Sequence, residues 1–148
     1  MNFIKIRNVK SPQRGTPGSA GIDFFVPNDL PGEQFLTPHE AINIPSGIKV
    51  KVPRGYALVF MNKSGVSLKK GLQVGACVID EDYQGEIHLH LINTSAEVQS
   101  IMPGEKLVQG LLLPVSLEDV VEMKDEEELY NGEKTERGEG GFGSTGTK

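Results

Sequence analysis

The sequence predicts an all-β protein made of many short strands, and two observations carry this prediction. Glycine and proline are frequent, at 18 and 9 of 148 residues, whereas tryptophan is absent and long helical runs are few. In several stretches apolar and polar residues alternate with a period of two, as they do in a strand with one buried face. At this chain length we expect a single hydrophobic core.

The clearest alternation lies in residues 74–93, which we interpret as two strands, 74–80 and 85–93, joined by a short polar turn. In the second strand Ile and Leu alternate with two histidines, so one face should be buried. Asp80 ends the first strand directly after two apolar residues. A carboxylate in that place can be held rigid and partly desolvated, as a general base must be; a solvated turn is an equally good interpretation of these residues alone.

Other strands are expected on either side of this region. The run 56–62 is apolar on both faces and therefore belongs in the centre of a sheet. The alternation over 44–52 is interrupted at residues 45–47, Pro-Ser-Gly, where we expect a turn or a bulge. The remaining expected strands are the short runs 3–6, 22–27 and 98–101 and the buried run 106–114.

Two polar positions near these strands are candidates for function. Asp23 is the one carboxylate in the apolar run 22–27 and needs a partner, for which a solvated metal, an arginine or backbone donors are the alternatives. Ser64 is expected to cap one short helical turn that Gly71 ends. Free backbone N–H groups, hydroxyls and lysines together suit an anion, although a plain helix cap with solvated lysines is the other interpretation.

The glycine-rich tail from Arg137 to Lys148 cannot build a core. It matches the dinucleotide-binding pattern G-x-G-x-x-G twice, but neither match has the strand and the helix that the pattern requires. The tail does contain an arginine, a phenylalanine, two adjacent hydroxyls and many unhindered N–H groups. This inventory can wrap a phosphate chain and place a ring over a base.

The stretch 116–130, before this tail, is ambiguous. Ser116 begins a capping-box pattern, which favours a helix, whereas the β-branched residues that follow favour a strand. Residues 124–136 are acidic and polar, and we expect a solvated loop there.

Composition excludes several classes of function. A net charge of -5 gives no basic footprint for a nucleic-acid polymer. Cys77 has no second cysteine to pair with, which favours a reducing compartment. The N-terminus lacks the apolar core of a signal peptide, and no apolar run approaches 18 residues. We therefore expect a cytoplasmic protein, in the host cytoplasm if it is viral, with no membrane partner.

Five segments together resemble the motifs of the trimeric dUTPase family, in the family's order and across nearly the whole chain. They are GSAGIDF from Gly18, KSGVS from Lys63, GACVIDEDYQGE from Gly75, GEKLVQG from Gly104 and RGEGGFGSTG from Arg137. The resemblance implies a distorted jelly-roll β-barrel or sandwich, the dUTPase-like β-clip, with at most one short helix. The implied organisation is a barrel core at 1–123, an acidic insertion or linker at 124–136 and a flexible arm at 137–148 that closes over the active site.

The resemblance also implies an activity, the hydrolysis of dUTP to dUMP and pyrophosphate, which keeps uracil out of DNA and supplies dUMP for thymidylate synthesis. Asp80 would activate the water that attacks the α-phosphorus. Asp23 would reach a Mg²⁺ ion through water, with the ion held mainly by the substrate's phosphates. The enzyme would be a homotrimer whose active sites are shared between subunits.

The substrate-binding residues follow from the same resemblance. Uracil would pair with the backbone around Cys77 and His88, and Tyr83 would pack under the sugar. Lys63 and Lys106 stand where the family commonly has arginine. Lysine keeps the charge but cannot make arginine's two-pronged contact to phosphate. The implied phosphate contacts of the barrel are Lys63, Ser64, Gly65, Lys106 and Gln109. Those of the arm are Arg137, Ser144 and Thr145, while Gly143 is a further substrate-binding residue and Phe142 would stack over the uracil.

Two alternatives remain from the sequence. A dCTP deaminase shares the fold and the trimer, but it needs an additional catalytic carboxylate and arginine near the second motif, and residues 63–68 contain neither. A non-enzymatic jelly-roll module that binds regulatory partners would release no pyrophosphate from dUTP.

Overall fold

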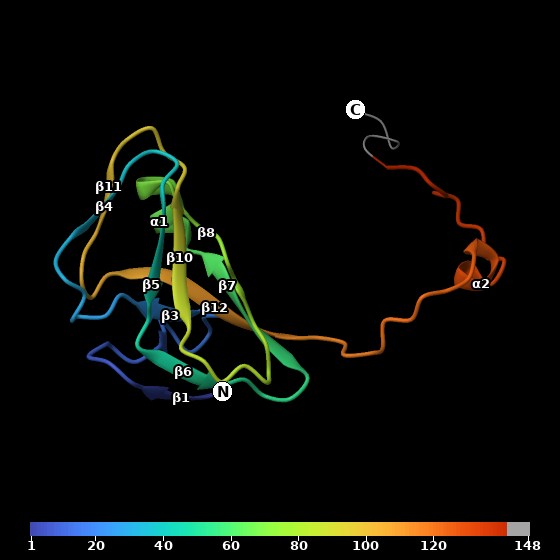
Figure 1. The fold of residues 1–148 in the computed structure, drawn as a ribbon, viewed down its shortest axis with the longest axis horizontal. Helices are drawn as coiled ribbons and strands as arrows, with labels where there is room; N and C mark the ends of the chain where they lie inside the picture. Colours follow the sequence, from blue (N-terminus) through green and yellow to red (C-terminus); the bar gives the residue numbers. More distant parts are fainter. Residues whose placement is uncertain (142–148) are drawn as a thin grey trace. The chain divides into compact units, whose positions relative to one another are not determined.

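The fold is described for residues 1–141 of a computed structural model, shown in Figure 1. The chain divides into two compact units, Met1–Ser116 and Leu117–Lys148. The first unit contains one helix, α1 (Ser64–Lys70), and twelve strands, and the described part of the second contains one helix, α2 (Glu126–Tyr130). The strands are β1 (Asn2–Lys5), β2 (Gln13–Arg14), β3 (Ile22–Phe25), β4 (Gln34–Leu36), β5 (Ala41–Pro45), β6 (Ile48–Lys51), β7 (Tyr56–Asn62), β8 (Leu72–Val74), β9 (Val78–Ile79), β10 (His88–Asn93), β11 (Gln99–Ile101) and β12 (Lys106–Pro114).

The largest sheet has the strand order β2-β3-β12-β7-β9, with antiparallel neighbours throughout. Its two long strands, β12 and β7, lie side by side at its centre, as their apolar sequences predict. In the register of this sheet Gln109 lies between Asp23 on β3 and Met61 on β7. The sheet therefore places the one buried carboxylate of β3 beside a polar residue of β12.

A second sheet, β5-β10-β8, supplies the other side of the core, and two strand pairs, β1-β6 and β11-β4, complete the unit. The face of β10 predicted to be buried is buried, because Leu89 and Leu91 are at most 1% exposed. Between β5 and β6 the expected turn is also present, at Gly47, whose φ of +73° favours glycine. The all-β prediction is confirmed, with two short helices where one was expected.

The predicted hairpin over 74–93 is wrong in one respect. β8 pairs with β10, but β9 leaves β10 and pairs with β7 instead. The chain thus changes sheets at residues 75–77. Alternation within a strand reports which face is buried and carries no information about the partner strand, so the sequence could not show this change.

The helix cap predicted at Ser64 differs from the structure. Helix α1 begins after Lys63, which makes no side-chain cap bond, so Ser64 is the first helical residue and not the cap. Its predicted end at Gly71 is confirmed, with a left-handed φ of +63°. In the second unit α2 begins after Asp125, whose side chain accepts the Glu128 N–H at 3.0 Å. Of the two alternatives left open from residue 116, neither a helix nor a strand forms over residues 116–121.

Among residues 1–141, no helix is both long enough and apolar enough to cross a membrane.

Candidate functional site

A cavity of about 250 Å³ opens where β9 leaves β10. Four residues expected to contact substrate lie in its wall together, namely Cys77, Asp80, Tyr83 and His88. The residues that line this β9–β10 cavity are Asn43, Ala76, Cys77, Val78, Ile79, Asp80, Tyr83, Glu86, Ile87 and His88.

Backbone groups of two strands border the β9–β10 cavity. β9 is the last strand of its sheet, and β8 covers β10 only over Leu91–Asn93. The outer edge of β9 and the edge of β10 at His88 therefore have no strand partner within the described chain. Two open strand edges beside one cavity offer backbone donors and acceptors to a planar polar ring.

His90 supports the change of sheets, although its sequence position marked it only as a residue of the polar face. Its backbone carbonyl accepts the Gly75 N–H at 3.0 Å, and its Nδ1 accepts the next N–H, that of Ala76, at 2.9 Å. The ring fits because residue 75 is glycine, where a Cβ atom would lie 2.0 Å from Nδ1. Asn43 is a second residue that the sequence did not reveal, and its amide nitrogen lies 2.9 Å from Nδ1 of His88 in the cavity wall.

Asp80 is exposed at the rim of the β9–β10 cavity. Its side chain makes no hydrogen bond or ion pair within residues 1–141, and its carbonyl accepts the Tyr83 N–H at 3.3 Å. The partial desolvation expected for Asp80 is therefore not provided by the packing of this single chain. A free carboxylate at a cavity rim can accept a proton from water once a ligand fills the cavity.

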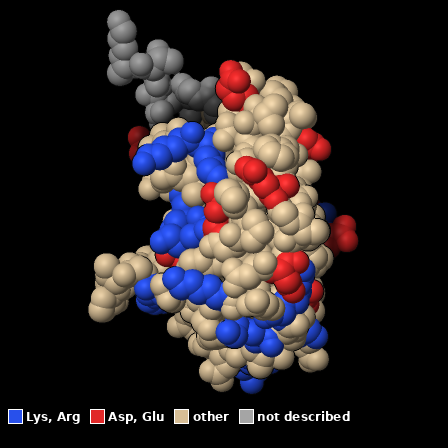
Figure 2. All heavy atoms as spheres, turned by 90° about the vertical axis from the view of Figure 1, so that its left-hand side faces the viewer, with Lys and Arg blue, Asp and Glu red and all other residues tan. Residues whose placement is uncertain are grey.

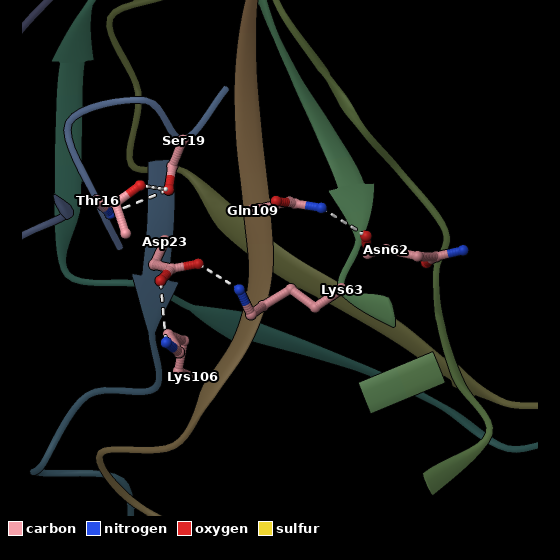
Figure 3. A network of polar contacts seen from close by, with 7 residues as sticks. All are labelled: Thr16, Ser19, Asp23, Asn62, Lys63, Lys106 and Gln109. Carbon is pink, nitrogen blue, oxygen red and sulfur yellow. Dashed lines mark hydrogen bonds and ion pairs between the residues drawn. The ribbon is translucent and has the colours of Figure 1, made fainter. Parts of the chain in front are cut away.

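A second set of predicted residues, the Asp23 group, comprises Asp23, Lys63, Lys106 and Gln109 (Figure 3). Asp23 is only 4% exposed, and Figure 3 shows both lysines pointing toward its carboxylate. Lys63 Nζ donates to one oxygen, and Lys106 Nζ lies 3.0 Å from the other. Within the described residues the partners of Asp23 are thus two lysines, which the sequence analysis did not consider as its partners.

The two lysines determine the ionisation of Asp23. Burial alone would raise the pKa of the Asp23 carboxyl, but the hydrogen bonds and charges of Lys63 and Lys106 outweigh it and hold the pKa below its ordinary value. Asp23 is therefore an anion at neutral pH, and the Asp23 group carries a net positive charge.

Replacing Asp23 by asparagine should lower the free energy of unfolding by about 2 kcal/mol at pH 7, because two lysines lose their carboxylate. We place the value below that of a fully buried pair because the Lys106 side chain is 45% exposed. Since the folded-state pKa is lowered, this stabilisation is present above the unfolded-state pKa of about 4 and is lost as the pH falls through the folded-state value. Thermal unfolding of both proteins at pH 7 and at decreasing pH below 4 tests this, and a difference that does not shrink with acidity contradicts it.

Gln109 is fixed in the same region. Its Nε2 donates to the Asn62 carbonyl at 2.9 Å, and a Cβ atom at Gly21 would lie 2.1 Å from its Oε1. The glycine of the first motif therefore makes room for the glutamine of the fourth. Ser64 and Gly65, the neighbours of Lys63, are both exposed.

The two sets of residues do not form one site on a single chain. Asp23 and Ile79 lie three strand spacings and three residues apart in the large sheet, or roughly 17 Å. None of the four members of the Asp23 group lines the β9–β10 cavity. In the second unit Arg137 donates from Nε to the Gly140 carbonyl at 2.7 Å. Phe142, Gly143, Ser144 and Thr145 lie outside the described residues.

Charge is unevenly distributed along the chain. Half of the 20 acidic residues fall in the second unit with only four of the 15 Lys and Arg residues, so the net negative charge comes from that unit. Figure 2 shows Lys and Arg lying mainly on one side of the face it presents and Asp and Glu mainly on the other. The first unit can therefore attract an anion although the whole chain is acidic.

The fold and these residues define a class of protein, a small all-β protein with a cavity where the chain changes sheets and a separate polar group with a net positive charge. A sequence model of the dUTPase family matches residues 7–146, and the chain belongs to this family. It is similar to the deoxyuridine 5'-triphosphate nucleotidohydrolase of Hydrogenobaculum sp. (strain Y04AAS1), at 40% identity over 139 residues that cover 93% of this chain and 90% of the relative. The enzyme of the same name from Finegoldia magna is 35% identical over 150 residues, which cover 99% and 98%.

Solved structures agree with the fold. The dUTPase of Staphylococcus bacteriophage 80alpha, solved with dUpNHpp, superposes with a TM-score of 0.83 at 24% identity and covers 98% of this chain and 97% of that one. The dUTPase of Streptococcus mutans gives a TM-score of 0.68 at 26% identity, covering 81% of this chain and all of that one. The predicted jelly-roll-like fold is thereby confirmed.

Proposed function

We propose that this protein is a dUTP diphosphatase, which hydrolyses dUTP to dUMP and pyrophosphate in the cytoplasm. The observation that carries the proposal is the β9–β10 cavity, which has two open strand edges in its wall and Asp80 at its rim. The curated relatives share the name of this activity and align over nearly the whole chain. The reaction keeps uracil out of DNA.

The base occupies the β9–β10 cavity and pairs with the backbone near Cys77 and His88. Cytosine presents a donor where uracil presents an acceptor, and a pairing site of this kind discriminates by about 10⁴-fold because buried groups would be left unpaired. The ring of Tyr83 packs under the sugar. Its hydroxyl donates to the Glu86 carbonyl at 2.9 Å, which fixes the ring where it excludes a 2′-hydroxyl by bulk.

Asp80 is the catalytic residue in this proposal. It accepts a proton from the water that attacks the α-phosphorus, and pyrophosphate leaves on the opposite side. Its side chain has no partner within residues 1–141, so it is free to meet that water. The bound nucleotide then supplies the desolvation that the single chain does not provide.

The triphosphate is held by cationic and polar residues of other copies of the chain. The roughly 17 Å between Asp23 and Ile79 supports a site shared between copies, in which the cavity of one subunit faces the Asp23 group of another. We take the assembly to be the homotrimer that the family resemblance implies. Ser64, Gly65 and Gln109 contact the phosphates beside the lysines. Arg137, Phe142, Gly143, Ser144 and Thr145 come from the arm of a third subunit.

These residues fit a Mg²⁺ ion only if the phosphates of the substrate supply most of its ligands. Within residues 1–141 there is no cluster of three acidic, histidine or cysteine side chains that could hold a metal. Both oxygens of Asp23 already face lysines, so Asp23 is suited to a water-mediated contact with an ion that dehydrates reluctantly. When bound, Mg²⁺ offsets the charge of the three phosphates.

A pyrophosphate assay against dUTP, dTTP, dCTP and UTP, with and without Mg²⁺, tests this function. We expect pyrophosphate release from dUTP at a rate at least 10³-fold above that from each of the other three nucleotides. Without Mg²⁺ the rate with dUTP should decrease greatly. Ammonia release from dCTP would instead support the deaminase alternative. No pyrophosphate from dUTP would support the non-enzymatic alternative.

A further inference from the structure

The turn that carries Asp80 contains three consecutive carboxylates, and the structure separates them. Asp80 and Asp82 are exposed, whereas Glu81 is half-buried. The side chains of Asp80 and Asp82 make no hydrogen bond or ion pair within residues 1–141. The middle carboxylate therefore has a different environment from its two neighbours, which the sequence alone did not indicate.

Glu81 is bonded to another part of the barrel. Its Oε2 accepts the backbone N–H of Gly55, 26 residues earlier in the chain, at 2.5 Å. Gly55 lies in the turn between β6 and β7 with φ of +77°, a conformation that favours glycine. On the other side of this turn Lys51 Nζ lies 3.5 Å from the Glu81 carbonyl.

The far end of the same segment is held in the same way. Oε1 of Glu86 accepts the N–H of Gly47 at 2.7 Å, and Gly47 also has a positive φ. The Ile87 backbone then bonds to Ser46 and Ile48 at 2.9 Å each. Residues 82–85 have no hydrogen bond to another strand or turn within residues 1–141, so the glutamates at positions 81 and 86 fix the two ends of the turn.

We propose that Glu81 is a positioning residue for the reaction, which sets the place of Asp80 through its bond to the Gly55 N–H. Asp80 lies between the end of β9 and this bond, so both of its backbone neighbours are fixed. A misplacement of a reacting group by about 1 Å can cost about 100-fold in rate. The inference rests on the proposed role of Asp80.

The test compares Glu81→Gln with Glu81→Asp. Glutamine keeps the length and an oxygen that accepts the Gly55 N–H, whereas aspartate keeps the charge but is one methylene too short. We expect Glu81→Gln to retain kcat within about threefold of the original, and Glu81→Asp to lose about 30-fold in kcat with KM changed less than about threefold. Asp82→Asn, in the same turn and with the same loss of charge as Glu81→Gln, should leave both constants unchanged.

A second measurement does not depend on turnover. Hydrogen exchange of the Gly55 amide should be at least tenfold faster in Glu81→Asp than in the original protein and nearly unchanged in Glu81→Gln. Equal exchange in all three proteins, or a Glu81→Gln variant as impaired as Glu81→Asp, overturns the proposal. If none of the three proteins hydrolyses dUTP but their Gly55 exchange rates differ as expected, the proposed function is wrong, while the bond from the Gly55 N–H to Glu81 is confirmed.

Discussion

Asp80→Asn is expected to lower kcat for dUTP by at least 10³-fold while the affinity for the nucleotide changes less than about threefold. Asparagine has the same shape and cannot accept the proton of the attacking water. The Asp80 side chain has no partner within residues 1–141, so the change removes no contact on which the fold depends. Pyrophosphate release and direct binding of a non-hydrolysable dUTP analogue give the two quantities.

Asp82→Asn is the matched control for this experiment, because it removes the same charge two residues away at a position that is also exposed. We expect it to retain turnover within about twofold. If Asp80→Asn kept more than a tenth of the original rate, Asp80 would not be the general base. If it lost nucleotide binding as well, its role would be in ground-state binding.

Removal of residues 137–148 is expected to lower kcat/KM for dUTP by at least 100-fold without unfolding the protein. The truncation deletes Arg137 and the proposed contacts of Phe142, Ser144 and Thr145, so both the charge at the far end of the triphosphate and the cover over the base are lost. Within 137–141 no residue is buried, and the core residues all lie in the first unit. The melting temperature should therefore change by less than about 2 °C.

Deletion of Lys148 alone serves as the control for the truncation, since this residue is outside the proposed contacts. It should leave kcat/KM unchanged. Circular dichroism and light scattering on both shortened proteins show whether the fold and the assembly persist. Unfolding of the protein that ends at Glu136 would mean that the tail has a structural role.

Much of the fold could be predicted from the sequence because burial and turn chemistry are local properties. The bounds of β7 and β12, the buried face of β10 and the turn at Gly47 all follow from periodicity or from glycine. The change of sheets at residues 75–77 does not, since alternation within a strand does not identify its partner strand. The cavity lies at that change of sheets, so its shape could not be predicted from the sequence.

The same distinction between local patterns and contacts of distant residues applies to the candidate site. Asp23 was marked as a charge that needs a partner, but its lysines are 40 and 83 residues away, and only the sheet register brings them together. Motif position identified Asp80, whereas the inward turn of Glu81 depends on the N–H of Gly55 in a distant turn. The roles of His90 and Asn43 likewise depend on contacts between strands.

The central claim about the reaction is that water attacks the α-phosphorus of dUTP. Hydrolysis in water enriched in ¹⁸O, followed by mass spectrometry of both products, tests this claim directly. The account predicts one labelled oxygen in dUMP and none in the pyrophosphate. Label in the pyrophosphate would place the attack on the β-phosphorus and would contradict it.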